Sequence, residues 1–269
     1  MALQKEIWLA DIIEPLYAQN TFAAQSVDHS AFVNGAVVHV PNAGNPPEIV
    51  KNRSTFPATA TRREDTDLTY TLNDYSTDPV HIPNADAVEL SYDKRQSVLG
   101  QIQLALADKV HEDLLKSWID GARASKTSPA GTSHKSVILD IAGQFNKQDI
   151  PQEGRFAVVD AIFYASLLRE LTDFEGQSFL ASANAQTGAI GRLYGLTLYQ
   201  RSTLKASSQD DIFAWHKGSV SRALGQTEIF VDDQNPLYYG DIFSALVRAG
   251  GAVIRSDKAG TAFIHVAAE

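Results

Sequence analysis

Residues 93–121 read DKRQSVLGQIQLALADKVHEDLLKSWIDG, and this stretch predicts one long helix. Asp93 suits the N-cap, with Gln96 three residues later as in a capping box, and Gly121 suits a left-handed residue after the last turn. The helix is therefore expected over residues 94–120, which is about 40 Å long. Its apolar side chains recur at spacings of three and four, so they form one buried stripe. The stripe consists of Leu99, Ile102, Leu106, Val110, Leu114 and Trp118.

The segment before this helix predicts a long two-stranded excursion. Residues 36–40 are rich in valine, which is typical of a strand. Leu68, Tyr70 and Leu72 alternate with polar residues, which indicates a second, half-buried strand. Between and beside these strands the prolines disfavour pairing with further strands. Six of the ten prolines lie here: Pro41, Pro46, Pro47, Pro57, Pro79 and Pro83.

Charge in the excursion is divided into two blocks. Residues 51–63 hold four bases and no acid, and residues 64–78 hold five acids and no base. The bases are Lys51, Arg53, Arg62 and Arg63, and the acids are Glu64, Asp65, Asp67, Asp74 and Asp78. The two blocks are expected to pair with each other or with a second copy of the chain.

The rest of the chain mixes helices and strands without a strict βαβ repeat, which favours an α+β fold. Residues 188–204 are expected to form turns and a hairpin. Gly250 and Gly251 are expected to separate two strands. Helices are expected at residues 137–145, 161–171 and 219–224, and strands at 156–159, 211–215, 242–247 and 262–266.

Composition excludes several classes of protein. The chain has 269 residues, 44% of them hydrophobic, so it can bury a sizeable core. It has no cysteine, which excludes disulfides, thiolate metal sites and cysteine nucleophiles. The net charge of −9 disfavours broad binding to nucleic acid. No long apolar run predicts a membrane span or a secretory signal.

No motif predicts catalysis. The seven histidines are scattered and none forms an HExxH pair, so no metal or cofactor is expected. His111 is expected on a solvated helix face, and the pairs Asp210-Asp211 and Asp232-Asp233 suit turns. No Gly-x-Ser-x-Gly elbow occurs. A non-enzymatic role is expected.

The order of these parts resembles the major capsid protein of tailed bacteriophages, which has the Hong Kong 97 fold. Residues 31–41 and 69–72 resemble its extended loop, and 75–82 and 89–95 resemble the approach to its spine helix. Residues 188–199 resemble part of its axial domain. Three further stretches resemble its closing strands: residues 212–218, 239–240 and 247–254.

The resemblance implies five parts of the chain. They are an N-terminal arm (1–35), an extended loop (36–80), a peripheral domain with the spine helix (81–135), an axial domain (136–240) and C-terminal strands (241–269) that return to both domains. Because the chain starts almost at the arm, a separate scaffold protein, or none, is expected. No motif predicts a crosslink between subunits.

The implied function is that of a subunit of an icosahedral virion shell, assembled in the host bacterial cytoplasm. Copies would form hexamers and pentamers around double-stranded DNA, with portal and decoration proteins as further partners and no membrane. The expected interface in the loop is Lys51, Arg53, Arg62, Arg63, Glu64, Asp65 and Asp67, and in the arm it is Trp8 and Phe22.

Two other functions remain open at this point. An encapsulin-like nanocompartment would use the same fold to enclose a protein cargo. A monomeric α+β hydrolase would use residues 41–83 as a proline-rich lid.

Overall fold

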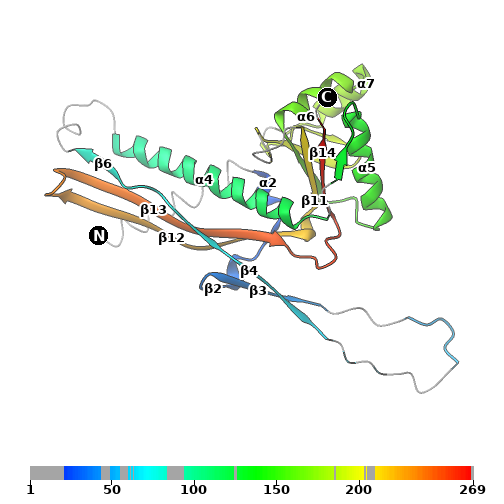
Figure 1. Cartoon of the computed structure of the whole chain (residues 1–269), viewed down its shortest axis with the longest axis horizontal. Helices are drawn as coiled ribbons and strands as arrows, with labels where there is room; N and C mark the ends of the chain where they lie inside the picture. Colours follow the sequence, from blue (N-terminus) through cyan, green and yellow to red (C-terminus); the bar gives the residue numbers. More distant parts are fainter. Residues whose placement is uncertain are drawn as a thin grey trace.

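The computed structural model describes residues 21–43, 49–54, 60, 62, 64–83, 94–123, 126–184, 186–202, 204 and 210–267 (Figure 1). Its helices are α2 (Thr21–Ala24), α4 (Lys94–Gly121), α5 (His134–Lys147), α6 (Ala161–Glu170) and α7 (Asp173–Ala181), with short 3-10 turns at Ser30–Phe32 and Lys217–Ser219. The first strands are β1 (Val27–Asp28), β2 (Val33–Asn34), β3 (Val37–Asn42), β4 (Thr66–Thr71), β5 (Asn73–Ser76), β6 (Val80–Pro83) and β7 (Lys126–Ser128). The others are β8 (Arg155–Val159), β9 (Gly191–Leu193), β10 (Leu196–Gln200), β11 (Asp211–His216), β12 (Val220–Asn235), β13 (Gly240–Val253) and β14 (Thr261–Val266).

The long helix α4 lies along a five-stranded sheet, in the order β1-β12-β13-β5, in which β6 also pairs with β13 (Figure 1). Its apolar stripe faces the sheet, and the side chains that are described are buried: Ile102, Leu106, Val110, Leu114 and Trp118. Asp93 and the side chains of Gln96 and Leu99 lie outside the described residues.

The prediction that Gly121 adopts a left-handed conformation is wrong. Gly121 is the last residue of α4 and has no positive φ. A Cβ at this position would lie 2.9 Å from Cγ2 of Val253, so the glycine allows the helix end to approach β13 closely. The small residue is required by packing rather than by the turn.

Two expectations for the C-terminal third are also wrong. Residues 219–224 are not a helix, because Val220 begins the 16-residue strand β12. Gly250 and Gly251 do not end a strand, because β13 continues through them and pairs with Ala223 and Arg222 of β12. The expected domain boundary at residue 240 falls at the turn of this hairpin. Strand β12, on the axial side of that boundary, lies in the sheet that packs on α4.

A second sheet has six strands in the order β7-β14-β11-β8-β10-β9. Strand β11 is at its centre, and residues 211–215 are all buried. Ile212 and Ala214 face a core that is shared with α5, α6 and α7. Phe213 and Trp215 face a core that is shared with α2 and the C-terminal end of α4. The central strand therefore joins the helical layer to the long helix.

The third sheet, β2-β3-β4, carries the extended loop (Figure 1). Strands β3 and β4 pair antiparallel from Val37 and Thr71 out to Asn42 and Thr66, as the sequence predicts. Leu68 and Tyr70 are half-buried, whereas Asp67, Thr69 and Thr71 are exposed. This confirms the predicted alternation.

Candidate inter-subunit surfaces

The base of the extended loop is anchored to the body of the chain. Val38, Leu72 and Ala223 form a small buried cluster that joins the loop strands to β12. Beside it, the guanidinium of Arg248 donates to both carboxylate oxygens of Asp74, at 2.5 and 2.9 Å. Hydrogen bonds from Arg248 outweigh the effect of burial and lower the pKa of Asp74. Packing and the bidentate ion pair together set the direction in which the loop leaves the sheet.

Two members of the acidic block, Asp67 and Asp74, have partners near the base of the loop. Asp67 accepts a hydrogen bond from Nδ1 of His39 on the paired strand, at 2.8 Å, and Asp74 binds Arg248. Glu64 and Asp65 are exposed. Lys51, Arg53 and Arg62 form no ion pair with a described acid and Arg63 lies outside the described residues, so the expected pairing, within the chain or with a second copy, stays a prediction.

Residues 51–53 of the basic block lie in the far part of the extended loop (Figure 1). Lys51, Arg53 and Arg62 are exposed, and none of the three forms an ion pair with a described residue. Ile49 is 94% exposed beside them. Arg63 lies outside the described residues. The loop end therefore presents positive charge and an apolar side chain that its own chain does not cover.

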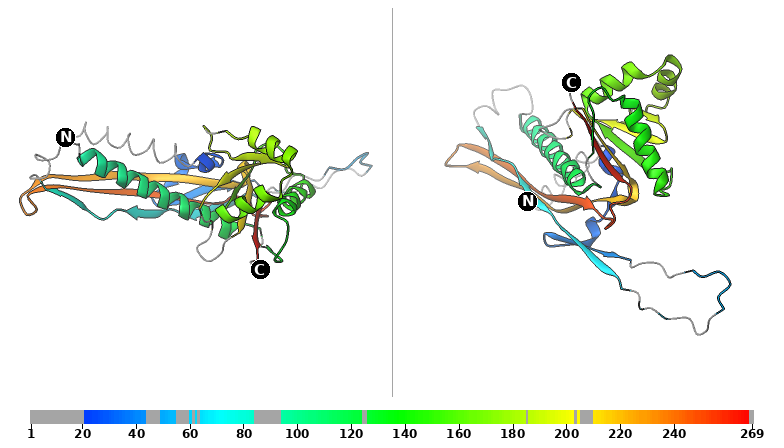
Figure 2. Two further views of the ribbon diagram at one scale, coloured as in Figure 1. Left: turned by 90° about the horizontal axis from the view of Figure 1, so that it is seen from above. Right: turned by 45° about the vertical axis from the view of Figure 1, so that its right-hand side comes forward.

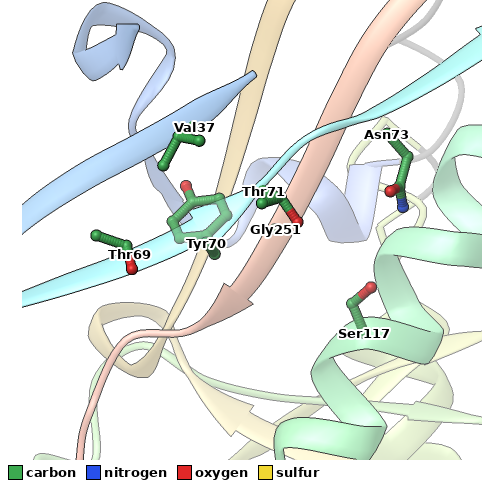
Figure 3. Close-up of a pocket in the computed structure, with 7 residues that line it drawn as sticks. All are labelled: Val37, Thr69, Tyr70, Thr71, Asn73, Ser117 and Gly251. Carbon is green, nitrogen blue, oxygen red and sulfur yellow. The ribbon is translucent and has the colours of Figure 1, made fainter. Parts of the chain in front are cut away.

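A pocket of about 390 Å³ lies where the loop base meets α4 and β13 (Figure 3). It is lined by Val37, Thr69, Tyr70, Thr71, Asn73, Ser117 and Gly251. Tyr70 is the only titratable side chain of this lining, and burial raises its pKa. Apart from Val37 and Gly251, the lining consists of hydroxyl, amide and phenol groups.

Phe22, which the sequence places at an interface with a neighbour, is instead buried within its own chain. Its ring packs edge-on against Trp118 and Trp215, with centroids 6.3 and 6.5 Å apart, and Arg201 lies over its face. This packing places α2 in the core at the C-terminal end of α4. Trp8, the other residue expected in the arm, lies outside the described residues.

His111 also differs from its expected place on a solvated helix face. The side chain is 1% exposed, and its Nδ1 lies 2.6 Å from the carbonyl oxygen of Ala107. Burial lowers the pKa of His111 to about 4, so the ring is neutral at neutral pH. It is part of the packing between α4 and Phe22.

A cluster that the sequence did not indicate joins three elements of the six-stranded unit. His134 at the start of α5 lies between Glu170 at the end of α6 and Asp210 just before β11. Its Nδ1 is 2.7 Å from Glu170, and its Nε2 is 2.8 Å from Asp210. Glu170 also accepts hydrogen bonds from the hydroxyl of Ser133 and from the backbone N–H groups of His134 and Lys135. The carboxylate therefore caps the helix.

The cluster raises the pKa of its histidine and lowers the pKa of one of its carboxyl groups. Burial opposes charge on His134, but hydrogen bonds to Glu170 and Asp210 outweigh it and raise the pKa of His134. Burial likewise opposes charge on Glu170, but hydrogen bonds from Ser133, His134 and Lys135 lower the pKa of Glu170 to about 2. The charged forms of both groups are therefore stabilised in the folded chain.

Stability of the six-stranded unit is expected to depend on pH through this cluster. Because the pKa of His134 is raised on folding, its contribution is complete below the unfolded value near 6.5 and is lost as pH rises through the folded pKa. His134→Gln is expected to cost about 1–3 kcal/mol at pH 6 and less at pH 8.5. Denaturant unfolding at both values measures this. His81→Gln is the control, since His81 is exposed and has no ion pair with a described residue. An equal cost at both pH values would show that the imidazolium does not stabilise the fold.

Two negative findings concern the described residues only. No group of three or more His, Cys, Asp or Glu side chains among them is arranged to hold a metal ion. Of the helices they form, none has the length and apolar character needed to cross a membrane.

Comparison with known proteins identifies the fold. No family model and no curated protein sequence matches the chain. Among solved structures, the capsid of the cyanophage P-SCSP1u is 15% identical, with a TM-score of 0.67 over 91% of this chain and 87% of that chain. The capsid of a native GTA particle is 12% identical, with a TM-score of 0.68 over 93% and 90%. A virus-like particle from Pyrococcus furiosus is 8% identical, with a TM-score of 0.62 over 97% and 99%.

These similarities extend over almost the whole of both chains, so the likeness is not limited to one sheet or one motif. The chain has the Hong Kong 97 fold of tailed-phage capsid proteins, in the α+β class that the sequence predicts.

Proposed function

We propose that the chain is a structural subunit of an icosahedral viral shell, assembling into hexamers and pentamers that enclose double-stranded DNA. The observation that carries this proposal is the shared fold over about nine-tenths of both this chain and the phage and GTA capsid chains. The net charge of −9 supports enclosure of DNA without binding to it. The role is structural rather than enzymatic, and the site of function is the virion, after assembly in the host cytoplasm.

Within this proposal the chain has five parts, and the loop makes contact with a neighbouring copy. The parts are the arm (1–35), the loop (36–80), the peripheral domain (81–135), the axial domain (136–240), whose last strand β12 lies in the sheet that packs on α4, and the C-terminal strands (241–269). The exposed basic end of the loop supports this role, because it reaches beyond its own core. The proposed loop interface is Lys51, Arg53, Arg62, Arg63, Glu64, Asp65 and Asp67. Scaffold, portal and decoration proteins are further proposed partners.

A nanocompartment around a protein cargo is the second candidate. The similarity to a virus-like particle from Pyrococcus furiosus keeps this candidate open, because a shell with that description shares the fold over 97% of this chain with a TM-score of 0.62. The two functions share the fold and the need for a loop that crosses between copies. They differ in what the particle contains and in whether a tail is attached.

Electron microscopy and size-exclusion chromatography of the purified chain test the proposal. The expected result is closed shells or capsomers, and in material from a producing host, heads that contain DNA and carry tails. Tailless cages with protein inside would replace the virion proposal with the nanocompartment. A compact monomer under all conditions would refute both and leave the hydrolase to be tested.

A further inference from the structure

The turn that joins β2 to β3 contains a chemically reactive pair of residues, Asn34 and Gly35. The chain has ten asparagines, and Asn34 is the only one that a glycine follows. The backbone nitrogen of the residue after an asparagine can attack the side-chain carbonyl carbon of that asparagine. A side chain on the following residue hinders this attack, and glycine has none.

The structure places this pair in a tight turn. Val33 pairs with Val38 and Asn34 pairs with Val37, which leaves Gly35 and Ala36 as a two-residue connection. Gly35 has a φ of 64°, as in a type II′ turn, where glycine takes the first central position. A Cβ at Gly35 would meet nothing within 4 Å, so the space around this residue is open.

The two reacting groups are not engaged elsewhere. Asn34 and Gly35 are exposed, and the amide of Asn34 forms no hydrogen bond with a described residue. Among the described residues, no carbonyl accepts a hydrogen bond from the N–H of Gly35. Strand β2 is two residues long and lies at the edge of its sheet. Local opening of so short an edge strand costs little free energy and brings the two groups together.

The same turn supports the base of the extended loop. The carbonyl oxygen of Gly35 accepts a hydrogen bond from Nη1 of Arg248 at 3.4 Å, and Arg248 is the partner of Asp74. The carbonyl oxygen of Ala36 accepts from the N–H of Leu72 at 2.7 Å, and Leu72 belongs to the buried cluster that joins the loop strands to β12. Figure 1 shows β2 and the start of β3 at the body end of the loop, and the right-hand view of Figure 2 agrees.

We propose that Asn34 is a site of spontaneous deamidation, and that this modification withdraws ageing, unassembled copies of the chain from assembly. The backbone nitrogen of Gly35 forms a bond to Cγ of Asn34, and the side-chain nitrogen leaves as ammonia with the proton that the attacking nitrogen loses. Water then opens the resulting succinimide ring, at one carbonyl to give aspartate and at the other to give isoaspartate. The reaction requires water but no oxidant, reductant or enzyme.

The effect on assembly follows from the geometry of the turn. Both products replace a neutral amide by a carboxylate, and isoaspartate also lengthens the main chain by one methylene group. The longer chain does not fit the two-residue turn that pairs Asn34 with Val37, so the hydrogen bonds from Arg248 and Leu72 to this turn are weakened. The loop then leaves the body in a less defined direction. This step rests on the proposed shell function, because assembly is what requires a defined direction.

Peptide mass spectrometry of the purified chain tests the modification itself. At mildly alkaline pH, which favours loss of the proton from the attacking nitrogen, conversion at Asn34 is expected to be at least about tenfold faster than at any other asparagine. Gly35→Asn is expected to slow conversion at residue 34 by a similar factor, because asparagine tolerates the positive φ but adds a Cβ. Conversion at Asn34 no faster than at the other asparagines would overturn the proposal.

Assembly of fresh and aged protein tests the consequence. Modified Asn34 is expected to be at least about threefold rarer in particles than in the unassembled fraction of the same sample. Asn34→Gln blocks the reaction, because the attack would have to close a larger ring, and its aged sample is expected to keep the particle yield of the fresh one. Asn42→Gln, on β3, is the matched control and is expected to lose yield on ageing as the unaltered chain does. Equal modification in particles and in the unassembled fraction, or an equal loss of yield in aged Asn34→Gln, would overturn the withdrawal from assembly.

Failure of this inference and failure of the shell function give different results. Closed particles formed by a chain in which Asn34 stays unmodified on ageing would refute the inference and leave the shell function intact. If the unaltered chain forms no particle under any condition, the shell function fails and the withdrawal from assembly fails with it, whereas mass spectrometry of the purified chain still decides whether Asn34 is modified.

Discussion

Replacing residues 43–65 by Asn-Gly is expected to abolish closed shells while the remainder of the chain stays folded. Asn42 and Thr66 are paired in the register of β3 and β4, so a two-residue turn of the kind that Asn-Gly favours closes the shortened hairpin. The anchors of the loop base are kept, since Val38, Leu72 and the Asp74–Arg248 pair all lie outside the replaced segment. Only the part that reaches beyond the core is lost.

The measurement is electron microscopy of the variant together with its circular dichroism and denaturation midpoint. A second variant keeps the length of residues 44–65 but replaces them with glycine and serine. It separates the contribution of loop side chains from that of loop length, and it is also expected to form no closed shell. Closed shells in the shortened variant, with an unchanged denaturation midpoint, would show that the loop is not required between copies. Closed shells in the glycine-serine variant would show that its side chains are not required.

The parts of the fold that the sequence predicted are those with a strong local pattern. The period of the apolar stripe predicts α4, and the alternation around Tyr70 predicts β4, because each pattern is complete within one element. The helix α5 and the hairpin of β9 and β10 were predicted for the same reason. In each case the residues that determine the structure are neighbours in the sequence.

The secondary-structure predictions are wrong where pairing with residues distant in the sequence determines the structure. Residues 219–224 include Arg222, Ala223 and Leu224, which favour helices, but pairing with β13 and with β1 outweighs that preference. Gly250 and Gly251 look like a strand end, but they lie in the continuous pairing of β12 with β13. Tertiary pairing overrides local propensity at these positions.

Among the candidate sites, too, the sequence indicates those formed by neighbouring residues and misses those formed by distant ones. The basic block of the loop is visible in the sequence because no acid interrupts it between residues 51 and 63. The cluster of His134, Glu170 and Asp210 is not, because its members are separated by 36 and 76 positions. Phe22 was misplaced since only the folded chain brings Trp118 and Trp215 to it.

Gly251→Ala is expected to destabilise the chain by about 3 kcal/mol, at the upper end of the range for overpacking. The reason is that the added methyl group would overlap the paired strand and α4. A Cβ at Gly251 would lie 2.3 Å from the carbonyl oxygen of Ser221 and 2.3 Å from Cδ1 of Leu114. The first of these is backbone of the paired strand, so relief requires β12 or α4 to shift.

The same methyl group would disturb the hydrogen bond that ties the long helix to the sheet. Nε1 of Trp118 donates to the carbonyl oxygen of Ser221 at 2.8 Å, and the added Cβ would lie 3.1 Å from that nitrogen. Trp118 is 0% exposed. Movement of the helix away from the sheet is therefore expected to shift tryptophan fluorescence to longer wavelength.

Gly100→Ala is the matched control, because Gly100 lies in α4 and a Cβ there would meet nothing within 4 Å. It is expected to stabilise the chain by up to about 1 kcal/mol through helix propensity. Denaturant unfolding of both variants compares the same added methyl group at two sites and is expected to give changes of opposite sign. If Gly251→Ala also stabilised the chain, the close approach of α4 to β13 at this glycine would be refuted. The packing of α4 would then not be the reason for a glycine at position 251.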